Sequence, residues 1–362
     1  PASPAPEPAA PPVAPGLLPH ERHNTEASSI AMRFWSRAIG DRNPRHVSES
    51  YRPAFGDLGF VAHPCWLYSV QDTVIPLGPP GTQPIIAGTD WRFRRPVVQG
   101  DRLHTVARLI EQTEKPSRHA GGPALFQRIR VQYLDARGAE VASALSTIVR
   151  VSPAAAASSG KYRDWTRWRY TEAQLVAIER GYDAERVRGA EPRYYEEVGP
   201  NDLLDPIVRG PLSSEEIVLF VGGTRPVAGG AAFARGIASD GGGFVHPRMG
   251  TYETYAAGLI DDDTARALGF PAAHDCGIDR IAQMASLIAN WMGDAGRILA
   301  LDATLVAPAM LGDTTWFTGR VTGKQACDAE CGAIAIQATG TNQRGEVTVR
   351  GSARVALPLR VP

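Results

Sequence analysis

Alternating hydrophobic and polar positions along this chain predict strands that bury one face. Residues 126–133 (FQRIRVQY) and 333–337 (AIAIQ) alternate with a period of two, which is the spacing of side chains on one face of a strand. Two other segments, 66–74 and 278–292, are rich in apolar residues and are interpreted as buried helices. The hydrophobic pattern therefore indicates long strands around central helices, an α+β architecture.

The same residues punctuate both halves of the chain, which indicates an internal duplication. The extended runs 91–109 and 303–321 contain the same four residue types at identical mutual spacing. They are Pro96, Gly100, Asp101 and Arg108 in the first run and Pro308, Gly312, Asp313 and Arg320 in the second. Residues 137–141 (RGAEV) match 344–347 (RGEV), and each precedes a closing strand, which ends at Val151 or Leu357. Residues 59–65 (GFVAHPC) match 269–276 (GFPAAHDC), and each precedes one of the two helices. Each half is expected to contain one central helix and three or four antiparallel strands.

Composition divides the chain into four parts. Residues 1–22 are almost wholly Pro and Ala and are expected to form an extended tail, because such a segment buries too little apolar surface to fold. Residues 23–152 form the first half and residues 211–362 the second. Residues 153–210 form a connector that begins with an Ala/Ser-rich stretch.

Capping signals predict two helices near the connector. Thr171 and Gln174 form a capping box, and Gly181 stands where the C-terminal glycine of that helix is expected. Ser213 and Glu216 cap another helix, which opens the second half of the chain.

Composition and charge exclude several function classes. The 362 residues include 38 Lys and Arg and 38 Asp and Glu, and this zero net charge argues against nucleic acid or an anionic membrane as a partner. No apolar run is long enough to span a bilayer, and the N-terminus lacks the layout of a secretory signal. The four cysteines, Cys65, Cys276, Cys327 and Cys331, do not have zinc-site spacing, so no metal and a cytoplasmic location are expected.

The segment 41–46 (DRNPRH) carries the clearest chemical signal. Asn43 and Pro44 favour a turn, because proline fixes its own φ and moves the preceding residue out of the α region. A reversal there would direct Asp41 and His46 at one point, where a carboxylate and an imidazole could share a water and move a proton to or from carbon. The alternative is a surface loop in which Asp41 only caps the turn.

Residues 39–46, together with the duplicated halves, resemble the MaoC-like hydratase/dehydratase family, which is built on the hotdog fold. Segments 192–198, 290–294 and 312–316 are also similar to that family, and the resemblance covers nearly all of the chain after residue 23. It implies a double hotdog, in which each of two tandem units wraps an antiparallel sheet around a long helix. It also implies a hydro-lyase that adds water to a trans-2-enoyl thioester or removes it from an (R)-3-hydroxyacyl thioester.

The resemblance also implies the catalytic residues. In that family an Asp and a His activate the water, and Asp41 and His46 match those positions, while Asn43 matches the asparagine that orders the turn. The acyl group would be carried by coenzyme A or by an acyl carrier protein, with no other cofactor. In the second half Thr254 and Leu259 stand at the dyad positions, and neither moves a proton near neutral pH, so one active site per chain is expected.

The candidate substrate-binding residues are Asn43 and residues 63–65, which lie at the start of the first central helix. The family's glycine there, whose N–H polarises the thioester carbonyl, corresponds to Pro64, which has no N–H. The donor is therefore expected at Cys65 or a neighbour. His63 and His274 occupy matching places before the two helices, and a structural role with the ring bonded to backbone is the alternative to substrate binding. His119 lies in a loop and is assigned no role.

Two other functions compete with the hydratase hypothesis. A hotdog thioesterase would direct water at the thioester carbonyl instead of C3. A non-catalytic acyl-binding subunit is favoured by Pro64 and by the lost dyad of the second half. Exposed sheet edges favour a homodimer of double hotdogs, and the glycine-rich loop of about residues 224–245 is interpreted as a flexible loop beside the acyl channel.

Overall fold

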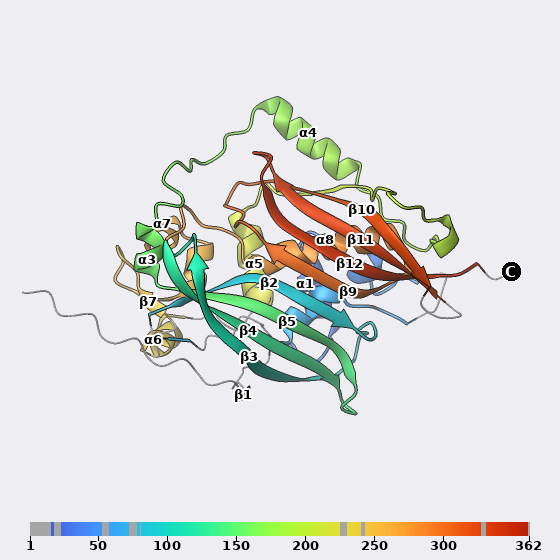
Figure 1. Ribbon diagram of the computed structural model, residues 1–362, viewed down its shortest axis with the longest axis horizontal. Helices are drawn as coiled ribbons and strands as arrows, with labels where there is room; N and C mark the ends of the chain where they lie inside the picture. The colour runs from blue at the N-terminus through green and yellow to red at the C-terminus, as the bar shows by residue number, and fades with distance from the viewer. Residues whose placement is uncertain are drawn as a thin grey trace, which may run out of the picture.

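The computed structural model describes residues 16–17, 23–52, 58–71, 78–79, 81–224, 230–239, 243–326 and 331–360. These residues form an α+β double hotdog, in which one large antiparallel sheet packs on helices (Figure 1). Of the predicted tail, the described part is β1 (Gly16–Leu17), which pairs with β3. Cys327 and residues 225–229 and 240–242 of the predicted glycine-rich loop lie outside the described residues. The prediction of a loop over about residues 224–245 is wrong for its middle part, which forms the helix α6 (Ala231–Ser239).

In the described part of the chain, eight long strands form the body of the sheet. They are β2 (Gln83–Phe93), β3 (Leu103–Ser117), β4 (Gly122–Asp135) and β5 (Glu140–Val151) in the first half, and β9 (Arg297–Leu305), β10 (Thr315–Ala326), β11 (Cys331–Asn342) and β12 (Val347–Pro358) in the second. Because β2 pairs with β9, the described strands share one ten-stranded sheet in the order β1-β3-β4-β5-β2-β9-β12-β11-β10-β6. The predicted duplication therefore organises the whole fold.

The connector contributes to this sheet. Its strand β6 (Ile207–Arg209) pairs with β10 at the edge of the second half. A separate small hairpin is formed by β7 (Gly243–Val245) and β8 (Tyr252–Thr254). The boundary predicted at residue 210 therefore assigns to the connector a strand that belongs structurally to the second half of the ten-stranded sheet.

The repeated Gly-Asp pair builds the same turn in both halves. Gly100 and Gly312 have φ values of 89° and 93°, which residues with a Cβ rarely adopt. Asp101 and Asp313 each accept, through Oδ2, the backbone N–H of the residue three positions earlier, at 3.0 and 2.9 Å. This turn divides the extended run predicted over residues 91–109 into β2 and β3.

Among the described residues, the central helix is long only in the second half. There α8 runs over Ile278–Met292, the predicted span, and all of its residues are buried against β9–β12 and the first half. The helix predicted over 66–74 is instead the six-residue 3₁₀ helix η1 (Pro64–Ser69), and residues 72–77 lie outside the described part. The prediction is wrong in type because buried apolar residues do not distinguish a short 3₁₀ helix from a longer α-helix.

The other helices cover the sheet or connect its strands (Figure 1). They are α1 (Ser29–Ala38), α2 (Pro44–Val47), α3 (Pro153–Ser158), α4 (Glu172–Asp183), α5 (Ser214–Thr224), α6 (Ala231–Ser239), α7 (Asp262–Ala267), η2 (Tyr195–Glu197) and η3 (Tyr255–Leu259). Within the described residues, no helix combines the length and the apolar character that crossing a membrane requires.

Both predicted capping boxes are present, at the starts of α4 and α5. Gly181, however, does not end a helix but lies inside α4. A Cβ at this position would come within 2.6 Å of the Val208 side chain on β6. Glycine is therefore required here for the close approach of α4 and β6, a tertiary reason that capping patterns cannot reveal.

Candidate active site

Asp41 is placed by the end of α1. Gly40 has a φ of 69°, and its N–H bonds to the carbonyl of Arg37 at 3.1 Å, while the N–H of Asp41 bonds to the carbonyl of Ser36 at 2.8 Å. These two bonds form a Schellman motif, which needs the left-handed conformation that glycine adopts at low cost. The chain therefore leaves α1 in a defined direction, with Asp41 buried at the start of the next turn.

The Asn43-Pro44 turn brings His46 back to Asp41. Asn43 caps α2 by accepting the N–H of Arg45 through Oδ1 at 3.0 Å, and Pro44 takes the first helical position, where an N–H is not needed. Nδ1 of His46 then lies 2.7 Å from Oδ2 of Asp41, and both side chains are buried. The predicted juxtaposition of the two residues is present in the structure.

The carboxyl group of Asp41 is ionised in this setting. Burial raises its pKa, but the charge and ring hydrogen bond of His46 and the N–H of Asn43 together lower the pKa to about 2. A carboxylate only accepts hydrogen bonds, so Nδ1 of His46 donates to Asp41 and Nε2 is the ring nitrogen left to exchange a proton. His46 is therefore oriented as a base whose imidazolium form Asp41 would stabilise.

A small cavity of about 60 Å³ lies beside His46. It is lined from the first half by Asn43, His46 and residues 61–64, and from the second half by the C-terminal end of α8, including Met292. Asp41 does not line this cavity, because its two oxygens bond to His46 and to the N–H of Asn43. The pair therefore does not flank one water as expected. His46 lines the cavity, and Asp41 lies behind it, bonded to Nδ1 of its ring.

The turn is held by residues of the second half and of the connector. Nδ2 of Asn43 donates to Oδ1 of Asn290 on α8 at 3.3 Å, and Nδ2 of Asn290 donates to Glu185 at 3.0 Å. Glu185 is paired with Arg209 on β6 at 2.8 and 2.9 Å, and both side chains are buried. Asn290 belongs to a segment that is family-like in sequence, but no local pattern marks Glu185 or Arg209, because only tertiary contact links them to the site.

His63 caps η1 with its ring. Nδ1 accepts the N–H of Cys65 at 3.1 Å and the Nε1–H of Trp35 at 3.4 Å. Nε2 therefore has the proton and donates to Oγ of Ser286 at 3.2 Å. The ring is bonded to backbone, which is the structural alternative considered for this residue, although His63 also lines the small cavity.

The predicted carbonyl donor at Cys65 is wrong for this conformation. The N–H of Cys65 already bonds to His63, Pro64 has no N–H, and the N–H of Trp66 bonds to the carbonyl of His63. Cys65 is also fully buried and does not line the cavity, whereas Pro64 does. The first three residues of η1 therefore offer no free donor to a thioester oxygen.

Asp41, His46 and His63 are close enough to be compared with a metal site, since one ligand atom from each lies within 4.8 Å of the others. Hydrogen bonds already account for these atoms, because His46 bonds to Asp41 and both ring nitrogens of His63 have partners. These hydrogen bonds fix the orientation of both imidazole rings.

The second half contains the counterpart of this corner of the fold. Val61 forms an isolated β-bridge with Val98 in the loop after β2, and His274 forms the equivalent bridge with Met310 in the second half. His274 therefore corresponds to Val61, and Cys276 corresponds to His63. The predicted match of His63 with His274 is wrong by two residues, because the bridge residue directly follows Phe60 in the first half but lies four residues after Phe270 in the second.

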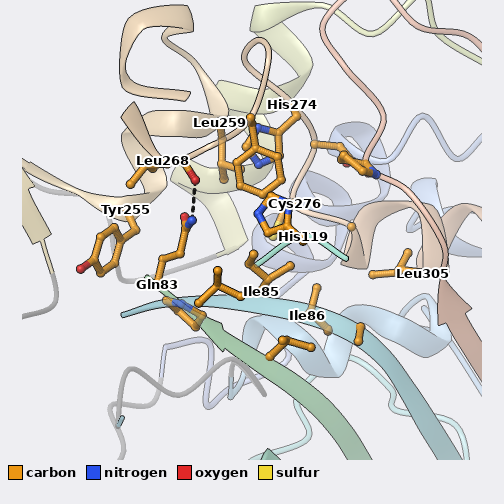
Figure 2. Close-up of a pocket in the computed structure, with 18 of the residues that line it drawn as sticks. Gln83, Ile85, Ile86, His119, Tyr255, Leu259, Leu268, His274, Cys276 and Leu305 are labelled. Atoms are coloured by element: carbon orange, nitrogen blue, oxygen red, sulfur yellow. Dashed lines mark hydrogen bonds between the residues drawn. The ribbon is translucent and has the colours of Figure 1, made fainter. Parts of the chain in front are cut away.

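Thr254 and Leu259 occupy the dyad positions of the second half. Both line a separate cavity of about 610 Å³ (Figure 2). Neither side chain transfers protons near neutral pH, so the second half has a cavity at the equivalent place without the proton-transfer pair. Of the two equivalent pairs, only Asp41 and His46 can transfer protons near neutral pH.

The fold is expected to lose stability in mild acid, because two buried histidines are neutral. Burial lowers the pKa of His63 to about 3 and that of His274 to about 4, from 6.5. Below about pH 6.5 the unfolded chain binds protons that the folded chain does not. The free energy of unfolding should therefore fall by about 1.4 kcal/mol per histidine per pH unit until the folded pKa is reached.

Denaturant unfolding at about pH 7, 6 and 5 measures this slope. His63→Gln and His274→Gln should each make the slope shallower, and an unchanged slope in both variants would contradict the assignment. Asp41 changes the pH dependence of the free energy of unfolding only at lower pH. Its pKa of about 2 lies below the ordinary 3.8, so its stabilising contribution is complete above about pH 4 and is lost as the pH falls toward 2.

Comparisons with known proteins agree with this geometry. Residues 20–144 match the family model of the FAS1-like dehydratase domain region. A solved MaoC-like dehydratase is 15% identical, with a TM-score of 0.61 over 95% of this chain and 97% of that protein. A structure described as a MaoC domain protein dehydratase from Chloroflexus aurantiacus is 13% identical, with a TM-score of 0.54 over 96% of each chain.

The full-length peroxisomal multifunctional enzyme type 2 from Drosophila melanogaster is 12% identical, with a TM-score of 0.51 over 91% of this chain and 47% of that protein. A comparison with curated proteins finds no match. The matched residues 20–144 include the whole Asp41–His46 turn. The resemblance stated from the sequence is thus confirmed: residues 20–144 match the FAS1-like dehydratase region, and the fold of the whole chain is similar to that of solved MaoC-like dehydratases.

Proposed function

We propose that the protein is an enoyl-thioester hydratase or, in the reverse direction, an (R)-3-hydroxyacyl-thioester dehydratase. The observation that carries this proposal is the buried 2.7 Å contact between Asp41 and His46, beside a cavity lined by both halves. The match of residues 20–144 to a dehydratase region supports the same reaction class. The substrate would be a trans-2-enoyl group carried by coenzyme A or by an acyl carrier protein.

In the hydration direction, Nε2 of His46 accepts a proton from a water in the cavity as the water oxygen bonds to C3. The electrons of the C2=C3 bond move toward the thioester carbonyl, and Asp41 stabilises the imidazolium that forms. His46 then returns the proton to C2. In the dehydration direction the same groups remove the C2 proton and protonate the departing hydroxyl, so no redox step is involved.

The charged side chains at the cavity favour an anionic carrier. Arg45, Arg95 and Arg297 line it, against one carboxylate, that of Asp294. Positive charge beside a cavity attracts phosphorylated groups, and both coenzyme A and the phosphopantetheine of a carrier protein have them. The small volume, about 60 Å³, favours short acyl groups as the first to test.

The occupied N–H of Cys65 favours a second candidate, an acyl-thioester-binding protein without turnover. Oxyanion donors are worth about 3 kcal/mol each in the transition state of acyl chemistry, and the start of η1 offers none that is free. The two candidates make different predictions for a variant in which the missing N–H is restored.

Pro64→Gly is expected to raise kcat for hydration several-fold, because glycine restores an N–H at the first position of η1, beside the cavity. The equivalent position of the second half is already a glycine, Gly277. Steady-state rates and melting temperatures are compared with those of Pro153→Gly, a proline at the first position of α3. An unchanged or lower kcat in a folded Pro64→Gly protein would count against this account of the carbonyl site.

The function itself is tested with a panel of trans-2-enoyl-CoA esters. A hydratase lowers the absorbance of the conjugated thioester without releasing thiol. A thioesterase releases free thiol with no change at C2–C3, and a binding protein does neither. The hydratase proposal would be rejected if the folded protein hydrated none of these esters and only released thiol from them or bound them.

A further inference from the structure

The cavity of about 610 Å³ in the second half is not used by the proposed reaction. Its volume is within the range of about 300–1,000 Å³ that small-molecule sites have. It shares no lining residue with the cavity beside His46. Arg280 lines the large cavity and Met292 the small one, and these residues are about 18 Å apart along α8 at about 1.5 Å per residue. The two cavities are separate places in the fold.

The two cavities nevertheless occupy equivalent positions in the duplicated fold. His46 lines the small cavity, and Leu259, at the equivalent position, lines the large one. Pro64 and Gly277 form a second such pair. The second half therefore retains and enlarges the site cavity, while Thr254 and Leu259 replace the groups that transfer protons.

The walls of the large cavity are mainly apolar. Ile85 on β2 lies on one side and Leu259 on the other (Figure 2). Phe270 packs against the rings of His119 and His274, with centroid distances of 4.7 and 4.0 Å. His119, which the sequence places in a loop without a role, is thus part of this wall. An aliphatic chain suits such a surface.

Two polar side chains on this wall have no protein partner. Both ring nitrogens of His119 and the hydroxyl of Tyr162 are buried and make no hydrogen bond within the described part of the chain. Burial and the charge of Lys161 lower the pKa of His119 to about 4, so its neutral ring offers one N–H near neutral pH. Nζ of Lys161 lies 4.8 Å from the Tyr162 ring centroid. Buried donors rarely lack partners. These atoms do not open onto the cavity in this conformation, and a rotation of both rings toward a ligand oxygen would satisfy them.

We propose that this cavity is a second, non-catalytic binding site for one aliphatic chain that ends in an oxygen acceptor, either a carboxylate or a thioester carbonyl. The chain lies against Ile85 and Leu305, and the acceptor receives the hydrogen bonds of His119 and Tyr162. The cavity and its lining alone support this assignment, which does not depend on hydration at His46.

Calorimetric titration of the full chain with hexanoate, octanoate and decanoate tests the apolar part of the site. Each additional pair of methylene groups should tighten binding roughly fifteenfold, since burying a methylene group is worth about a fourfold change in Kd. Decanoyl-CoA, titrated in parallel, distinguishes a thioester from a carboxylate. Decylammonium should bind at least about tenfold more weakly than decanoate, because it has no acceptor and is repelled by Lys161.

Variants locate the bound chain. Ile85→Trp places an indole against the bound chain in the large cavity and should weaken decanoate binding at least about tenfold, whereas Ile110→Trp, the same change at an exposed position on β3, should leave it unchanged. Met292→Trp fills the small cavity and should also leave it unchanged. A variant with Tyr162→Phe and His119→Phe keeps the rings and should weaken decanoate binding at least about tenfold.

Two results would overturn the proposal: affinity that does not depend on chain length, and decanoate affinity that is unchanged in Ile85→Trp. Binding that is lost in Met292→Trp and kept in Ile85→Trp would place the chain beside His46 instead. If Ile85→Trp does not fold, the double variant at positions 119 and 162 decides, and unchanged decanoate affinity there rejects the proposed acceptor contacts.

Discussion

Asp41→Asn is expected to lower the rate of enoyl-thioester hydration on the order of 10³-fold. The carboxylate accepts the Nδ1–H of His46 at 2.7 Å and would stabilise the imidazolium that forms during proton transfer. An amide is neutral and can present its own N–H to Nδ1, which favours the unproductive tautomer. KM should change little, because Asp41 does not line the cavity. Steady-state rates on a trans-2-enoyl-CoA ester measure both quantities.

The matched control is Asp302→Asn, which changes a carboxylate that is paired with Arg92 and partly exposed on the sheet. This variant should keep wild-type kcat. The Asp41→Asn protein should remain folded, since the side chain can still bond to both His46 and the N–H of Asn43. A folded Asp41→Asn protein with kcat within about threefold of wild type would contradict the assigned role of Asp41.

Arg280→Ala is expected to destabilise the fold by about 3–5 kcal/mol. The guanidinium forms an ion pair with Asp275 and donates to the carbonyls of Ala307 and Thr348 at 2.7 and 2.9 Å. The two charged side chains are 3% and 1% exposed. Removal of Arg280 therefore leaves the carboxylate of Asp275 without a cation, in a place that water barely reaches. Denaturant unfolding near neutral pH measures the change.

Arg92→Ala is the control for this prediction, because Arg92 forms an exposed pair with Asp302 whose loss should change the free energy of unfolding by less than about 1 kcal/mol. Replacing Arg280 by Met together with Asp275 by Leu should recover much of the loss, since no buried charge then remains unpaired. A loss below about 1 kcal/mol for Arg280→Ala itself would show that water or a rearranged neighbour compensates Asp275.

Features defined by local hydrogen bonds and local spacing were predictable from the sequence. α8 has its predicted bounds because an apolar segment lies between Gly277 and Gly293, both of which adopt positive φ. The repeated Gly-Asp turns were visible because each is closed by bonds that span three residues. The approach of Asp41 and His46 follows from the same logic, since the turn at Asn43 needs only neighbouring residues.

Features that depend on tertiary contact were not predictable. Whether Asp41 faces the cavity depends on how α8 and η1 pack around the turn, and the structure places it behind His46. The availability of the Cys65 N–H depends on the rotamer of His63, which is held from the second half by Ser286. No single segment of the sequence contains that information.

The fate of the proton at C2 tests the central claim most directly. The protein and the His46→Gln variant are each incubated with a trans-2-enoyl-CoA ester in deuterium oxide, and the products are examined by mass spectrometry. We predict that the wild-type protein forms the 3-hydroxyacyl thioester with one deuterium at C2, while His46→Gln forms it at a rate lower by orders of magnitude. Absence of this product from the wild-type protein, or equal rates from both proteins, would contradict the role of Asp41 and His46.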